Sequence, residues 1–253
     1  MSQQAPPPRP SDPISTYFRV SRGAWYGFLF ALPVLLGYEL LEWLFGSRVI
    51  NGADAIVRAM LALLGPRERS VTMLVLVAVA GLLCWLFDGS RKATQLHEFR
   101  PRYFLWMFTE SLIYAISLGP AINHILGLLS GGVGLQMGGG GGGPIFALTM
   151  SLGAGIYEEL VFRVLLLGGL VLLLESVFKM DGLLAWVVGV VISSVIFSLF
   201  HYAPFGMEPF EFGSFIFRFV AGGLLATLYA ARGFGIAVWS HALYDVLVFA
   251  LSG

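Results

Sequence analysis

Long runs of apolar residues, separated by short polar segments, dominate the chain. A helix that crosses a bilayer needs roughly 20 mainly apolar residues. About seven runs approach or exceed this length, and they cover residues 23–45, 71–87, 103–129, 145–174, 183–200, 212–231 and 236–251. The fourth run is long enough to tilt or break, and the seventh is at the lower limit. The pattern predicts an all-α, polytopic membrane protein with about seven transmembrane helices in one bundle.

The segment between the first two runs has a different pattern. Residues 51–64 place apolar side chains on one helical stripe, whereas Asp54 and Arg58 lie off or beside it. This pattern is typical of an amphipathic helix that lies in the membrane interface. An eighth, re-entrant span is the alternative.

Two polar or glycine-rich segments bound the domain organisation. Residues 1–13 are rich in proline and polar residues, which predicts a disordered tail. Residues 131–143 are dense in glycine and are expected to form a flexible connection. We therefore expect residues 14–253 to form a single membrane domain. Lys and Arg are more numerous on the N-terminal side of the predicted spans, which favours a cytoplasmic N-terminus.

Composition agrees with a membrane protein and excludes other classes. Of the 253 residues, 57% are hydrophobic and only 12% are charged, against about 25% charged in soluble domains. The formal net charge is zero, which excludes a strongly basic nucleic-acid-binding protein. A single cysteine, Cys84, excludes an internal disulfide framework and a CxxC metal site.

Ionisable residues inside the apolar runs are the main functional signal, because each costs from about 2.5 kcal/mol upward in a bilayer. The densest group is GIYEELVFR, residues 155–163. In an α-helix Glu159 and Arg163 share one face and can form an ion pair. Glu158 points away from Arg163, toward a different part of the protein. A carboxylate in an apolar, partly hydrated cavity is a suitable general base.

Two further groups complete the candidate site. FSLFH, residues 197–201, ends the fifth run on His201. HALYD places His241 and Asp245 one turn apart on one face of the last run. Such an Asp can fix the tautomer of the imidazole. If the three helices converge, the site contains a base, a second histidine to orient water, and groups to face an oxyanion.

The same residues leave the catalytic type open. They match the parts of a hydrolase that attacks a carbonyl with water. Glu158, His201, His241 and Asp245 also form a plausible ligand set for one divalent metal such as zinc. Using Glu158 as a ligand would remove it as the base.

In order and rough spacing, EELVFR, FSLFH and HALYD match the motifs EExxxR, FxxxH and HxxxN/D. The region from about residue 143 to residue 251 therefore resembles the CPBP family of intramembrane proteases. That family includes the CAAX prenyl endopeptidases and the Abi-type bacteriocin-processing or self-immunity proteins. The resemblance implies an intramembrane endopeptidase of a bacterial inner membrane that acts on membrane-associated proteins or peptides.

The resemblance also implies a role for each motif residue. Glu158 would activate water, while Glu159 and Arg163 would form the structural pair. His201 would hold or activate the water. The remaining pair, His241 and Asp245, would bind the oxyanion or serve as metal ligands. Asp245 departs from the asparagine of the prenyl endopeptidases, and an ionised Asp cannot donate a hydrogen bond to an oxyanion.

Two other functions fit a membrane protein with buried charges. A proton-coupled transporter or relay would spread its ionisable groups across the membrane, whereas a hydrolase would gather them in one water-sized site. A non-catalytic immunity or scaffold protein would tolerate the loss of Glu158. No role is assigned from the sequence to Glu39, Glu42, Glu110, His124 and Arg218.

Overall fold

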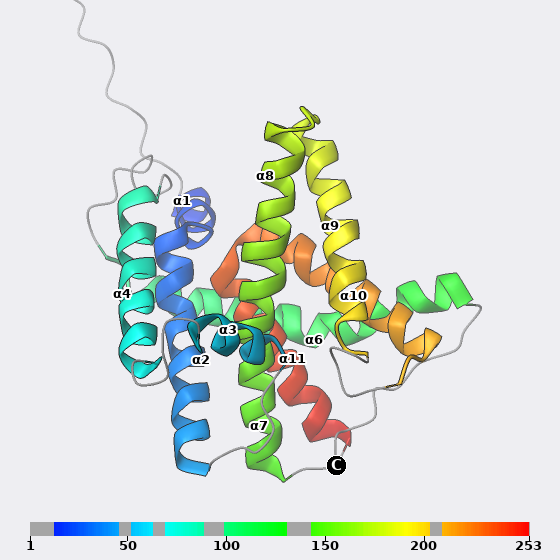
Figure 1. Ribbon diagram of the computed structural model, residues 1–253, viewed down its shortest axis with the longest axis horizontal. Coiled ribbons are helices and arrows are strands. Elements are labelled where there is room, and N and C mark those ends of the chain that lie inside the picture. Colours follow the sequence, from blue (N-terminus) through cyan, green and yellow to red (C-terminus); the bar gives the residue numbers. More distant parts are fainter. Residues whose placement is uncertain are drawn as a thin grey trace, which may run out of the picture.

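The computed structural model describes residues 13–45, 52–62, 69–88, 99–130, 143–202 and 209–252. The predicted tail and glycine-dense loop lie outside the described residues, apart from Pro13, which begins the first helix, and Gly143. The described ranges contain helices and no strand (Figure 1), which confirms the all-α class.

The described helices divide into an N-terminal and a C-terminal part of the chain. The N-terminal part contains α1 (Pro13–Ser21), α2 (Ala24–Phe45), α3 (Gly52–Ala62), α4 (Arg69–Phe87) and α6 (Arg102–Ser130). The C-terminal part contains α7 (Pro144–Gly153), the π-helix η1 (Ala154–Leu167), α8 (Gly168–Ser176), α9 (Gly182–Leu199), α10 (Phe212–Arg232) and α11 (Phe234–Ser252).

Five of the described helices are long and apolar enough to cross a membrane, namely Ala24–Phe45, Arg102–Leu128, Gly182–Leu199, Phe212–Arg232 and Phe234–Leu251. The fourth predicted run is not among these five helices, because it is divided among α7, η1 and α8, each shorter than 18 residues. The second run is represented by a shorter apolar helix, Leu76–Phe87. The protein is thus a multi-pass membrane protein, with five of its predicted spans present as single long helices.

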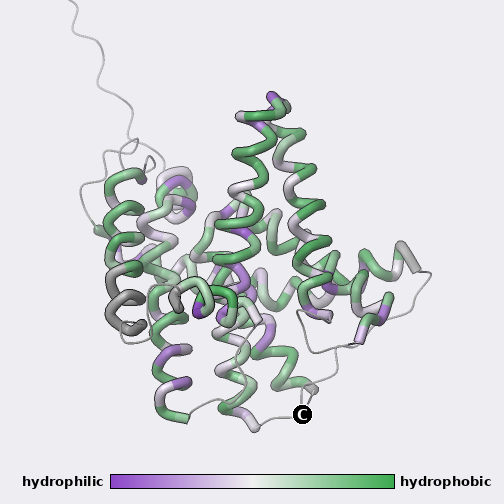
Figure 2. The backbone as a smooth tube through the Cα atoms, in the orientation of Figure 1, coloured by the Kyte–Doolittle hydropathy of each residue, from purple (hydrophilic) through white to green (hydrophobic). Residues whose placement is uncertain are grey.

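The burial pattern of α9 is the reverse of that in a water-soluble helix. Its buried positions are mostly small or hydroxyl residues, among them Ala185, Gly189, Ser193, Ser194 and Ser198. Its exposed positions are large and aliphatic, namely Leu183, Leu184, Val187, Val191, Ile192, Ile196 and Leu199. Helices pack in membranes through small residues, while large apolar side chains face the lipid. Figure 2 shows the resulting hydrophobic residues along α8 and α9.

Helix α11 occupies the centre of the fold and packs against α2, α6, α7, α10 and η1. Its close approach to α2 requires glycine, because a Cβ on Gly235 would lie 2.5 Å from the Gly27 carbonyl oxygen. The turn that leads into α11 also requires glycine. Gly233 has φ +82°, and its Cβ would lie 2.7 Å from the Arg22 carbonyl oxygen. These contacts fix the position of the helix that carries HALYD.

Carboxylate side chains cap the starts of α9, whose end carries the FSLFH motif, and of α10, which follows it. Asp181 accepts a hydrogen bond from the backbone N–H of Leu183 at the start of α9. Glu211 accepts from the backbone N–H groups of Gly213 and Ser214 at the start of α10. Side-chain acceptors at these positions satisfy backbone donors that a helix start leaves unpaired.

Helix α3 presents its polar pair to the protein and its apolar stripe outward. Asp54 is fully buried and Ala53 packs into the core, whereas Ala55, Ala59 and Met60 are exposed. Arg58 donates to Asp54 over 2.6 Å and pairs with Glu42 on α2. The outward stripe fits the predicted interfacial helix, because those apolar residues are free to contact lipid.

Candidate active site

A small cavity lies where α6, η1, α10 and α11 meet the end of α9. It has a volume of about 80 Å³ and is lined by Glu158, His201, His241 and Asp245, together with Arg218. The rest of its lining is apolar apart from Tyr244, and consists of Leu118, Ile122, Ala154, Phe197, Phe217, Ala221 and Leu225. This space accommodates a few water molecules. The cavity therefore gathers the candidate residues of all three motifs in one site.

The buried pair Glu159 and Arg163 forms as the spacing predicts. Arg163 Nε lies 3.2 Å from Glu159 Oε2, and both side chains are at most 1% exposed. The distance is that of an ion pair, although the orientation of these two atoms does not satisfy a hydrogen bond. The guanidinium also lies 4.4 Å from the centre of the Phe197 ring. Arg163 thus neutralises a fully buried carboxylate and connects η1 to α9.

The local helix geometry differs from the α-helical one assumed in the sequence analysis. Residues Ala154–Leu167 form a π-helix, in which backbone hydrogen bonds join residues i and i+5. π-Helical turns are rare and occur frequently at functional sites. In this wider turn Glu158 lines the cavity and Glu159 lies against Arg163, and both carboxylates also face His241.

His241 stands between carboxylates from two helices. Its Nδ1 lies 2.8 Å from Glu159 Oε1, in a buried hydrogen bond. Its Nε2 faces Asp245 at 3.7 Å and Glu158 at 4.0 Å. The partner at hydrogen-bond distance is therefore Glu159 rather than Asp245, which the sequence analysis had paired with this ring. A carboxylate accepts the Nδ1 proton, so Glu159 fixes the tautomer and leaves Nε2 directed toward the other two acids.

His201 is oriented by its own backbone. Its Nδ1 lies 2.9 Å from the Phe197 carbonyl oxygen, one helical turn earlier. A carbonyl oxygen only accepts, so Nδ1 must carry the proton, and Nε2 of the neutral ring is then an acceptor. The ring also stands edge-on to the Phe197 side chain, with centroids 5.0 Å apart. In this tautomer Nε2 can accept a hydrogen bond from water.

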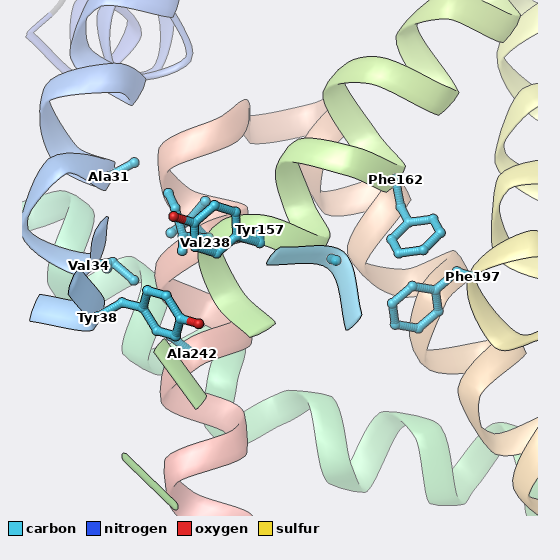
Figure 3. Close-up of a cluster of buried hydrophobic side chains, with 10 residues drawn as sticks. Ala31, Val34, Tyr38, Tyr157, Phe162, Phe197, Val238 and Ala242 are labelled. Carbon is cyan, nitrogen blue, oxygen red and sulfur yellow. The ribbon is translucent and has the colours of Figure 1, made fainter. Parts of the chain in front are cut away.

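Phe197 links two of the motifs. Its ring contacts both the guanidinium of Arg163 and the imidazole of His201. It also packs edge-on against Phe162, with ring centroids 5.2 Å apart (Figure 3). A Cβ on Gly222 would lie 2.8 Å from this ring, so α10 covers it closely. The first residue of FxxxH is therefore a packing residue that positions the arginine and the histidine.

Arg218 is the cavity residue that the sequence motifs did not include. It is 9% exposed, donates from Nη1 to Ser214 Oγ over 2.8 Å, and lies 5.4 Å from the Tyr202 ring centre. Its presence in an apolar run was the available signal, but nothing in the local sequence related it to the three motifs. The structure places its side chain in the lining of the same cavity.

Glu39 and Glu42 belong to a polar network beside the cavity. Glu39 accepts a hydrogen bond of 2.5 Å from the hydroxyl of Tyr157, the neighbour of Glu158. Arg58 pairs with Glu42 and with Asp54, and Asp54 also accepts from Tyr38. This network attaches α3 to α2 and η1.

Glu110 has a structural partner at the other end of α10. Arg232 contacts both of its carboxylate oxygens, with distances of 2.5 and 2.8 Å, and also donates to Ser21 on α1. The Tyr17 hydroxyl donates to the same carboxylate over 2.6 Å. Burial, followed by the neighbouring Glu110, raises the pKa of Tyr17 above its ordinary value, so it stays a donor. His124 is exposed and does not line the cavity.

The four residues that the sequence indicated as possible metal ligands, Glu158, His201, His241 and Asp245, all line the cavity. Among the residues that the structure describes, no group of three or more His, Cys, Asp or Glu side chains could hold a metal ion. His241 lies near Asp245 and Glu158 and is hydrogen-bonded to Glu159, whereas His201 is held by the Phe197 carbonyl oxygen. The catalytic type, with or without a metal, is therefore decided by experiment.

The fold and this cavity define an all-helical membrane protein with a buried acid–histidine site. Residues 141–247 match the family model of the Rce1-like type II CAAX prenyl endopeptidases. The matched region contains all three motifs and confirms the predicted resemblance to the CPBP family. Residues 1–140 lie outside the match. The search of curated proteins and the search of solved structures each gave no match.

Proposed function

We propose that this protein is an intramembrane endopeptidase that uses water activated by Glu158. One observation carries the proposal: a single small cavity is lined by Glu158, His201, His241 and Asp245, all within the Rce1-like region. A proton relay would have its ionisable groups distributed along a path across the membrane. The gathering of these four residues supports a hydrolytic site instead.

Glu158 and His201 are the residues proposed to activate and orient the attacking water. Glu158 removes a proton as the water oxygen attacks the carbonyl carbon of the peptide bond. The acceptor Nε2 of His201 orients the same water. When the tetrahedral intermediate breaks its C–N bond, the proton on Glu158 passes to the leaving nitrogen. The products are a carboxylic acid and an amine, so atoms and charges balance.

The oxyanion requires hydrogen-bond donors, and Asp245 as a carboxylate supplies none. We assign this role to Arg218, whose guanidinium is always charged and carries five N–H donors. His241 contributes a second donor when Nε2 is protonated, with Glu159 holding Nδ1. Asp245, 3.7 Å from Nε2, then stabilises the charged ring. Donors aimed at an oxyanion typically account for about 10²–10³-fold in rate.

The proposed substrates are proteins or peptides associated with the membrane, as the family's description suggests. We also propose that α4 and the continuous helix from α7 through η1 to α8 cross the bilayer, which gives the seven spans predicted from the sequence. A cytoplasmic N-terminus and a bacterial inner membrane complete the proposal. Cysteine accessibility on either side of the membrane tests this orientation.

The decisive experiment compares cells that produce the wild-type protein with cells that produce Glu158→Gln at the same level. We expect one or more membrane or secreted proteins to accumulate uncleaved in the variant, and their new termini identify the cleavage site. Identical proteomes would overturn the proposal and favour a non-catalytic scaffold.

The catalytic type is tested on the purified protein with a farnesylated CAAX peptide and its unprenylated form. The Glu mechanism predicts that a chelator leaves cleavage unchanged. Loss of cleavage in chelator, restored by added zinc, would replace this mechanism with the metal-dependent alternative.

A further inference from the structure

A second, larger cavity system lies away from the candidate active site, where the ends of several helices meet. Its outer part, here called the arginine pocket, has a volume of about 620 Å³. It is lined by Phe18, Arg19, Arg22, Gly23, Ala24, Phe87, Asp88, Ala231 and Arg232. Ala24 begins α2, Phe87 ends α4 and Arg232 ends α10. Because these are the ends of apolar helices, the arginine pocket lies at the level of the lipid headgroups.

The charges of the arginine pocket leave a positive excess. Arg232 is neutralised by Glu110, as shown above. Asp88 is 3% exposed and accepts a hydrogen bond from the backbone N–H of Trp25. Arg19 and Arg22 are both exposed. Two exposed cations against one buried carboxylate leave one positive charge, which complements the single negative charge of a phosphodiester.

The inner part of the system, here called the apolar cleft, continues from the arginine pocket. It has a volume of about 410 Å³ and shares Arg22 and Ala24 with the pocket. Its other lining residues are mainly apolar: Phe28, Ala80, Cys84, Leu160, Val164, Trp186, Tyr229, Ala230, Gly233 and Phe234. Both volumes lie in the range of small-molecule sites. A charged opening that leads into an apolar cleft is complementary to an amphiphile, which has a charged head and an apolar chain.

We propose that the arginine pocket and the apolar cleft together bind one anionic phospholipid. Its phosphate contacts Arg19 and Arg22, and an acyl chain lies in the cleft between α4 and η1. Basic residues at the membrane surface attract anionic lipids, and a negatively charged headgroup therefore favours this occupant over a neutral one. The chain would touch Leu160 and Val164, on the helix that carries Glu158. This proposal does not depend on the proposed protease activity.

The single cysteine of the chain provides the test, because Cys84 lines the apolar cleft. The purified full chain is treated with N-ethylmaleimide in detergent, and the alkylation rate is measured by mass spectrometry. We expect added phosphatidylglycerol to slow the reaction, and phosphatidylcholine with the same acyl chains to slow it far less. Equal protection by both lipids, or by neither, would overturn the proposal.

Variants separate the headgroup site from general membrane binding. The double variant Arg19→Gln with Arg22→Gln should bind phosphatidylglycerol about thirtyfold more weakly. Each arginine near the membrane surface contributes about 1 kcal/mol, and about 1.4 kcal/mol corresponds to a tenfold change in affinity. Arg102→Gln, an exposed arginine at the start of α6 outside both cavities, should leave the affinity unchanged. An equal loss in the control would contradict the site.

Two further probes identify the source of the ligand. Inorganic phosphate alone should not protect Cys84, because it has no chain to fill the apolar cleft. A farnesylated peptide should not protect it either. Protection by phosphate alone would overturn the lipid assignment, and protection by the peptide in place of phosphatidylglycerol would indicate a substrate site.

Discussion

Gly155, the first residue of the GIYEELVFR segment, allows η1 to approach α11 closely. A Cβ at this position would lie 2.6 Å from the Ala242 Cβ, 2.8 Å from the Val238 carbonyl oxygen and 3.0 Å from the Ala242 backbone nitrogen. Two of these atoms belong to backbone, so no side-chain rotation can relieve the contact. The substitution Gly155→Ala must therefore move one helix relative to the other.

The size of this movement follows from the contact distances. Carbon atoms pack at about 3.5–4.0 Å, so a contact of 2.6 Å requires the two helices to move apart by about 1 Å. Helix α11 carries His241 and Asp245, whose distances to the η1 carboxylates would increase accordingly. A misplacement of about 1 Å in an active site can lower the rate by about 10²-fold. Overpacking of this kind also destabilises a protein by about 1–3 kcal/mol.

The assay measures cleavage of the substrate found in the proteome comparison, together with the thermal unfolding midpoint. The matched control is Gly169→Ala in α8, because a Cβ there meets no heavy atom within 4 Å. The double variant Gly155→Ala with Ala242→Gly removes the shortest contact and should recover part of both properties. Normal cleavage and stability in Gly155→Ala, or equal losses in the control, would refute this reasoning.

Three other substitutions test separate parts of the structure. Glu158→Gln should lower cleavage at least about 10²-fold with an unchanged unfolding midpoint, and near-normal cleavage would remove this residue as the base. Arg163→Ala leaves the fully buried Glu159 without its cation and should destabilise by about 3–5 kcal/mol, so normal yield and thermal stability would contradict the structural pair. Arg218→Gln should lower kcat about 10²–10³-fold while KM changes little, and a change in KM alone would assign it to substrate binding.

The sequence predicted those features that depend on local periodicity or on the order of motifs. The long apolar runs predicted the all-α membrane fold. Spacing of four residues predicted the Glu159–Arg163 pair, and this pair is present. The three motifs together predicted that Glu158, His201 and His241 would share a site, and one cavity contains them.

Features that depend on contacts between distant segments were not predictable in this way. The hydrogen bond from His241 to Glu159 joins residues 82 positions apart, so helical spacing gave no sign of it. Helical spacing instead predicts a pair between His241 and Asp245, its neighbour on the same helix. Arg218 reaches the cavity because α10 packs against α9 and α11. Such packing follows from side-chain shape along whole helices rather than from a short motif.

The two consecutive glutamates have different surroundings because the π-helix and α11 meet at one imidazole. Glu159 is fully buried, and a buried carboxylate is tolerated only with a cation and hydrogen bonds nearby. Arg163 supplies the charge from the same helix, and His241 supplies the hydrogen bond from another. The carboxylate of Glu159 therefore couples the packing of η1 against α11 to the orientation of the ring. Its neighbour Glu158 can then face the cavity and the opposite nitrogen of that ring, so one structural acid positions the groups with which the proposed catalytic acid works.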